Sequence, residues 1–122
     1  MASNSFPVIT KQAAGNVEGI PTDLIMYGYD NQIMIVVTQI RKFGTILHAR
    51  QDVAYDGTTT YSVNTLMGKR DEPLLESCTR RLVEVMGTQG CKRPLILTLG
   101  LKSHTPTTLK GVMDLIVENK IW

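Results

Sequence analysis

The chain has 122 residues, 43% hydrophobic and 20% charged, which is enough for one folded domain with its own core. Its 13 basic and 11 acidic residues give a formal charge of +2 and are spread along the chain, without the concentrated basic stripe of a nucleic-acid binder. No apolar run approaches the ~20 residues that span a bilayer. We therefore expect a single domain over residues 1–122, with residues 1–6 as a disordered tail, and neither nucleic acid nor membrane as a partner.

The chain begins with weak strand signals. Residues 8–10 favour a short strand, and the small residues 13–16 that follow indicate a flexible connection. Gly19 indicates a bulge. Pro21 cannot donate a hydrogen bond to a neighbouring strand, so we expect it where the next strand starts.

Residues 22–40 predict a β-hairpin around Asp30-Asn31, because both turn residues tolerate the left-handed backbone of a two-residue loop. The β-branched residues after this turn favour a strand over a helix. A two-residue loop also sets the register of the two strands. The expected cross-strand pairs are Tyr29–Gln32, Tyr27–Met34, Ile25–Val36 and Leu24–Val37.

This register divides the hairpin into two faces, because side chains alternate along a strand. One face carries Leu24, Met26, Ile33, Ile35 and Val37. The other carries Asp23 and six further residues, namely Ile25, Tyr27, Tyr29, Met34, Val36 and Thr38. Neither face is polar enough to be left in water. We expect helices to cover the first face and a second protein chain to cover the other, with these six residues as a dimer interface.

The middle of the chain predicts two more strands, over residues 45–50 and 61–66. A turn at residues 41–44 precedes the first of them. Residues 52–60 contain Asp56-Gly57 and three threonines, which predicts a wide loop between the two strands.

The C-terminal half changes to helical periodicity at Asp71-Glu72-Pro73, a strong helix start. The apolar stripe of this helix consists of Leu74, Leu75, Cys78, Leu82, Val85 and Met86, with Gly87 or Gly90 as its stop. Residues 95–101 predict a buried central strand, and Thr105-Pro106 starts a second helix that ends near Glu118. The stripe of the second helix is Leu109, Val112, Met113 and Ile116, and Gly111 inside it indicates close packing. The fold class is therefore α+β, a mainly antiparallel sheet of about six strands with two helices on one face.

The residue types that support catalysis are sparse. The two histidines, His48 and His104, have no neighbouring acid or nucleophile pattern. The two cysteines have no metal-ligand spacing; we expect Cys78 to be a small buried residue and the chain to work in the reducing cytoplasm or nucleus. No glycine-rich phosphate loop is present. We predict no catalytic residue, no metal and no cofactor, hence a protein that binds proteins and not an enzyme.

Several short segments occur in an order and spacing typical of one family. They are Gly-Ile-Pro-Thr at 19–22, Val-Val-Thr-Gln at 36–39, Lys-Phe-Gly-Thr at 42–45, Asp-Glu-Pro-Leu at 71–74 and the terminal Trp122. From about Val8 to Trp122 the chain resembles the third of the eukaryotic proteasome assembly chaperones. The resemblance implies an α+β chaperone that pairs through its sheet, with itself or with the fourth chaperone of the set. It further implies that the pair binds α-type subunits of the 20S core particle as their ring assembles and leaves before maturation.

Two alternatives remain open from the residues alone. One is a generic dimerising scaffold of a trafficking or signalling complex. The other is a small-ligand binder or enzyme that uses Tyr27 and Tyr29 as a pocket wall, which predicts a concave site with convergent polar groups. For the chaperone hypothesis, we expect Arg41, Lys42 and Phe43 to contact the client ring.

Overall fold

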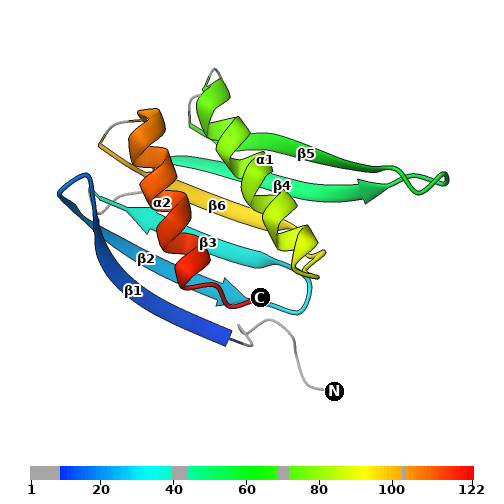
Figure 1. Ribbon diagram of the computed structural model, residues 1–122, viewed down its shortest axis with the longest axis horizontal. Helices are drawn as coiled ribbons and strands as arrows, with labels where there is room; N and C mark the ends of the chain where they lie inside the picture. Colours follow the sequence, from blue (N-terminus) through cyan, green and yellow to red (C-terminus); the bar gives the residue numbers. More distant parts are fainter. Residues whose placement is uncertain (1–8, 40–43, 69–71, 103) are drawn as a thin grey trace.

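The computed structural model describes residues 9–39, 44–68, 72–102 and 104–122 (Figure 1). Its elements in chain order are β1 (Ile9–Val17), β2 (Ile20–Gly28), β3 (Ile33–Thr38), β4 (Thr45–Val53), β5 (Thr59–Met67), α1 (Pro73–Thr88), β6 (Leu95–Gly100) and α2 (Pro106–Glu118). The predicted tail at residues 1–6 lies outside the described residues.

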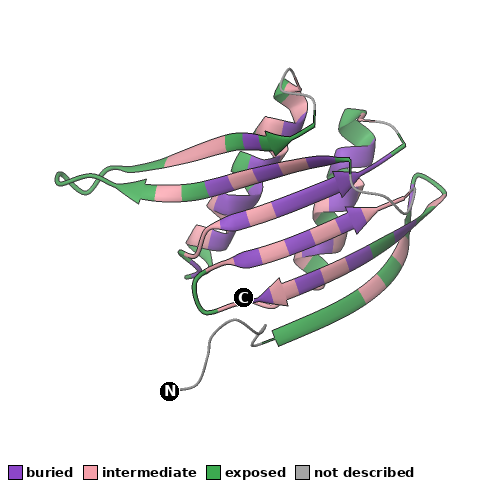
Figure 2. Cartoon of the chain, turned by 180° about the vertical axis from the view of Figure 1, so that it is seen from behind, coloured by how far each residue is buried: buried purple, intermediate pink, exposed green. Residues whose placement is uncertain are grey.

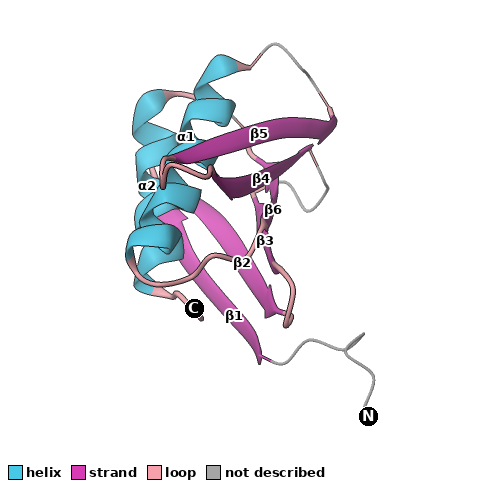
Figure 3. Cartoon of the chain, turned by 90° about the vertical axis from the view of Figure 1, so that its right-hand side faces the viewer, coloured by secondary structure: helices cyan, strands magenta, loops and turns pink. Residues whose placement is uncertain are grey.

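The described strands form a six-stranded sheet in the order β1-β2-β3-β6-β4-β5. Every neighbouring pair is antiparallel except β3 and β6, which run parallel. Both helices lie on one side of the sheet, as the edge-on view in Figure 3 shows. The predicted α+β class, with a mainly antiparallel sheet and two helices on one face, is confirmed.

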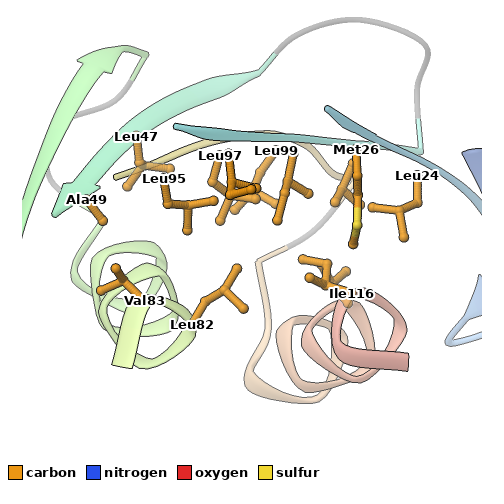
Figure 4. Close-up of a cluster of buried hydrophobic side chains, with 14 of the residues drawn as sticks. Leu24, Met26, Leu47, Ala49, Leu82, Val83, Leu95, Leu97, Leu99 and Ile116 are labelled. Atoms are coloured by element: carbon orange, nitrogen blue, oxygen red, sulfur yellow. The ribbon is translucent and has the colours of Figure 1, made fainter. Parts of the chain in front are cut away.

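The hydrophobic core lies between the sheet and the two helices (Figure 4). Leu95, Leu97 and Leu99 of β6 point toward the helices from the middle of the sheet, and each is at most 2% exposed. Leu82 of α1 and Ile116 of α2 are fully buried against them. The central strand predicted over residues 95–101 is confirmed as β6 (Leu95–Gly100), because strands on both sides and helices on one face remove it from water.

The predicted register of the hairpin at Asp30-Asn31 is confirmed. The Tyr29 N–H donates to the Gln32 carbonyl oxygen at 2.9 Å, which closes a two-residue loop. From that pair onward β2 and β3 align as expected, with Ile25 opposite Val36. The predicted core face of this hairpin is buried throughout, at 0–1% exposure, and consists of Leu24, Met26, Ile33, Ile35 and Val37.

The expectation for the segment before this hairpin was wrong in two respects. Residues 13–16 are part of β1, a nine-residue strand that pairs with β2 along its whole length. Gly19 is the second residue of a tight turn, in which Glu18 and Gly19 both have positive φ (55° and 74°). This turn lets β1 fold back on β2. The hydrogen bonds between the two strands then pair the backbone groups of residues 13–16, whose small side chains alone would not favour a strand.

The predicted wide loop at residues 52–60 is also wrong. β4 extends to Val53 and β5 begins at Thr59, so only a short turn remains between them. The Ala54 N–H donates to the Thr58 carbonyl oxygen at 2.8 Å, and the Thr58 N–H donates to Asp56 Oδ1 at 2.9 Å. These hydrogen bonds stabilise a hairpin whose tip projects beyond the rest of the sheet (Figure 1).

The chain between β3 and β4 does not join neighbouring strands, because β6 lies between them in the sheet. Gly44, at the end of this connection, lies against β6, where a Cβ atom would collide with the carbonyl oxygen of Leu99. Glycine is therefore needed at this position for a close approach between two backbones.

Both helices begin where the sequence predicts. α1 starts at Pro73 after Glu72, and α2 starts at Pro106 after Thr105, whose side chain accepts a hydrogen bond from the Thr108 N–H at 3.2 Å. The buried stripe of α1 is Leu75, Thr79, Leu82, Val83 and Met86. The buried stripe is thus rotated around the helix axis by part of a turn relative to the predicted stripe, which included Leu74, Cys78 and Val85. These three residues are only half-buried.

Candidate protein-interaction face

The sheet has one face that no described helix covers, and we call it the open face (Figure 2). It consists of the side chains that alternate with the core residues along each strand. Its central residues are Ile25 and Tyr27 of β2, Met34 and Val36 of β3, Ile96 and Thr98 of β6, and Ile46 and His48 of β4.

The strand register brings these residues into continuous rows across four strands. Val36 lies beside Thr98, and Thr98 lies beside Ile46. Met34, Ile96 and His48 form the next row. Thr98 is only 4% exposed because its small side chain lies between two larger aliphatic ones. The centre of the open face is thus mainly apolar, with Thr98 and His48 as its polar members.

All six residues predicted for the dimer interface lie on this face or at its border, and each is half-buried. Ile25, Tyr27, Met34, Val36 and Thr38 lie within β2 and β3. Tyr29 follows β2, and its carbonyl oxygen accepts a hydrogen bond from the Arg93 side chain at 2.8 Å. The predicted client contacts Arg41, Lys42 and Phe43 lie outside the described residues.

The border of the open face is mainly polar, except at Met67 of β5, which pairs with Ile46. On one side β1 contributes Thr10 and Gln12 opposite Tyr27 and Ile25. On the other side β5 contributes Ser62 and Asn64 opposite Arg50 and His48. An apolar centre with a polar rim is the anatomy of a protein–protein interface.

Sequence reasoning missed the contribution of β4 and β6 to this face. Ile46, Ile96 and Thr98 carry no signal that relates them to the hairpin at residues 22–40. The alternation in residues 95–100 could have separated the inward leucines from Ile96 and Thr98. It could not have placed β6 beside β3, because this pairing joins segments some sixty residues apart.

The two histidines lie on different parts of the fold within the described ranges. His104 Nδ1 lies 3.6 Å from Glu72 Oε1, next to the start of α1, while His48 lies on the open face. Among the described residues, no group of three or more His, Cys, Asp or Glu side chains could hold a metal ion.

The cysteines differ from the expectation. Cys91 is the buried one, at 8% exposure, whereas Cys78 is half-buried on α1. Cys78 directly precedes Thr79, which belongs to the buried stripe of α1. Cys78 therefore lies beside this stripe and is partly exposed. Burial still raises the pKa of the Cys78 thiol, which disfavours the reactive thiolate.

A cavity of about 480 Å³ lies where α1 ends and is lined by residues 89–94 and Trp122. The Trp122 Nε1–H donates to Gln89 Oε1 at 2.7 Å, which ties the segment after α2 to the end of α1. Neither Tyr27 nor Tyr29 lines this cavity, so it does not correspond to the pocket that a ligand-binding tyrosine face predicts.

A helix-backed sheet with an uncovered apolar face is the architecture of a small protein-binding domain. The family model for proteasome assembly chaperone 3 matches residues 35–119. The chain therefore belongs to the proteasome assembly chaperone 3 family.

None of the described helices is long and apolar enough to cross a membrane.

Individual relatives agree with this assignment. The chain is 33% identical to proteasome assembly chaperone 3 of Nematostella vectensis, over 89% of this chain and 86% of the relative. It is 28% identical to the Homo sapiens protein of the same name, over 94% and 95% of the two chains. A solved chain from a chaperone complex for yeast 20S proteasome assembly shares the fold, with a TM-score of 0.72 at 13% identity, covering 91% and 98%.

Proposed function

We propose that this protein is a non-enzymatic chaperone of 20S proteasome assembly that works as a dimer. The partner in the dimer is a second copy or the fourth assembly chaperone, and the pair holds α-type subunits while their ring forms. It leaves before the particle matures. Membership of the assembly chaperone family supports this role.

The observation that carries the proposal is the apolar centre of the open face. Ile25 lies beside Val36, Met34 lies beside Ile96, and Ile46 lies on the same face one strand further, with no described element over them. A surface of this kind is stable in water when a partner covers it. Two such sheets packed face to face would bury both apolar centres at once.

The free thiols support a proposal for the cellular compartment. Cys78 and Cys91 are both free, which fits the reducing cytoplasm or nucleus. We therefore expect the chaperone to act there.

Affinity capture from a eukaryotic lysate tests the function. Tagged protein should recover 20S α-type subunits in early assembly intermediates and should be absent from the mature particle. A generic scaffold of a trafficking or signalling complex would instead recover other proteins reproducibly. Capture without any α-type subunit contradicts the proposal.

A further inference from the structure

The outer edge of β5 carries unpaired backbone groups. β5 (Thr59–Met67) is the last strand in the sheet order and pairs with β4 alone. No other described element pairs with its far side. At nine residues it is longer than most strands, so it exposes a long row of peptide donors and acceptors.

The hairpin turn determines which of these groups point outward. The Ala54 N–H bonds to the Thr58 carbonyl oxygen, and hydrogen-bonded pairs alternate along an antiparallel ladder. Ser62 and Asn64 therefore direct their backbone groups toward β4. The N–H and C=O groups of Tyr61, Val63 and Thr65 are directed away from the sheet.

The two other exposed strand edges carry charged residues of their own, and β5 does not. On β1, the exposed Lys11 lies opposite the core residue Met26, so a charge points to the helix side of that edge. On the projecting part of β4, Arg50 and Asp52 form an ion pair at 3.5 Å, and Asp52 Oδ2 also accepts a hydrogen bond from the Ser62 hydroxyl of β5 at 3.4 Å. β5 (TTYSVNTLM) has no charge, proline or glycine and is rich in strand-forming residues.

An apolar pair lies at the end of this edge. The ladder between β4 and β5 shifts register between Ile46 and Leu47, so that Leu66 is an extra residue next to Met67. Leu66 is 55% exposed and Met67 is 61% exposed. Two large apolar side chains beside an unpaired edge provide an anchor for a chain that adds to the sheet.

We propose that the outer edge of β5 binds an extended segment of the client, which adds to the sheet as a further strand with an apolar residue against Leu66 and Met67. This inference rests on the proposed function, since the client is an α-type subunit. The occupant is not a second copy. When two copies of this chain pair through the open face, that face provides one self-complementary contact, and a second one through β5 would link dimers into an open chain.

Amide hydrogen exchange resolved to single residues tests the proposal. Exchange is measured on the protein alone and with each purified 20S α-type subunit in turn. With the subunit that binds, the outward amides of Tyr61, Val63 and Thr65 should slow at least tenfold. The matched control is the outward amides of Gln12 and Ala14 on β1, which should keep their rates.

Two substitutions supply an independent measurement. Val63→Pro removes an outward N–H, whereas Val63→Ala loses similar core contacts and keeps that N–H. The proline variant should bind the α-type subunit about tenfold more weakly than the alanine variant. If the proline variant does not fold, Leu66→Lys serves in its place, with Val53→Lys at a similarly exposed position outside β5 as its control.

The outcomes separate the two proposals. Binding of an α-type subunit without slower exchange at Tyr61, Val63 and Thr65 overturns the strand-addition proposal alone. Slower exchange that appears as the protein is concentrated by itself makes the occupant a second copy and also overturns it. If no α-type subunit binds the wild-type protein, the proposed function is wrong and the inference is wrong with it.

Discussion

Gly111 of α2 lies directly against Val17 of β1. A Cβ atom at position 111 would be 2.8 Å from Val17 Cγ1, closer than real side chains approach. Val17 is 4% exposed, so it has no free space into which to move. The glycine thus allows α2 to pack tightly on the sheet, as the sequence predicts for a glycine inside that helix.

We expect Gly111→Ala to destabilise the protein although alanine favours helices by ~1 kcal/mol over glycine. The clash with Val17 should cost about 1–3 kcal/mol and outweigh this gain. In a Val17→Ala background the clash disappears, and the same substitution should stabilise by up to about 1 kcal/mol. Urea unfolding of the four variants measures this change of sign. Equal effects in both backgrounds would show that the two residues do not interact.

Val36→Glu should give a folded monomer. Val36 lies on the open face, so a carboxylate there stays in water in the monomer and would be buried without a partner in the dimer, at a cost of several kcal/mol. The dimer dissociation constant should therefore rise by about 100-fold or more. Light scattering measures the mass and circular dichroism the fold.

The control for this substitution is the neighbouring residue. Val37 is 0% exposed on the core face, so Val37→Glu should unfold the protein. A Val36→Glu protein that unfolds, or that stays dimeric, would mean that the open face is not the dimer interface.

Lys42→Glu should weaken client binding. Arg41, Lys42 and Phe43 are the residues we propose for contact with the α-type subunits, and an ionic contact should also dissociate faster at high salt. Surface plasmon resonance in low and high salt measures both effects. Lys110→Glu, an exposed charge reversal on α2, is the matched control. Unchanged binding by the Lys42→Glu protein would retire this assignment.

Assembly should proceed without catalysis by this protein. A chaperone that holds subunits in register needs only different affinities for the assembling and the completed ring. The double variant His48→Ala, His104→Ala should therefore still promote ring assembly, and saturating ATP should leave client affinity unchanged. Native gel electrophoresis of the ring and titration with ATP measure the two. Loss of assembly by a well-folded double variant would indicate chemistry at these histidines.

Three features were predictable because local interactions determine them: the start of α1, the helix α2 and the central hairpin. The turn pair Asp30-Asn31 permits a two-residue loop, and this loop sets the register of β2 and β3 and assigns every side chain to a face. The same logic places the helix starts at Pro73 and Pro106. The six residues proposed for the dimer interface come from this local reasoning alone.

Residues 13–16 and 52–60 show where local reasoning fails. Their small and polar side chains favour loops when they are considered alone. In the folded chain, β1 obtains hydrogen bonds from β2, and the ends of β4 and β5 pair with each other. Tertiary pairing therefore overrides the weak local preference.

The sequence by itself determined the two helix starts, the hairpin register and the division of that hairpin into a core face and an apolar outer face. Only the tertiary structure placed β6 between β3 and β4 in the sheet, parallel to β3. This strand order extends the open face to Ile96, Thr98 and Ile46. The tertiary structure alone also left β5 at the edge of the sheet, with no described strand beyond it. The physical reason is that turns and caps depend on neighbours in the chain, whereas strand order depends on how distant segments bury their apolar side chains together.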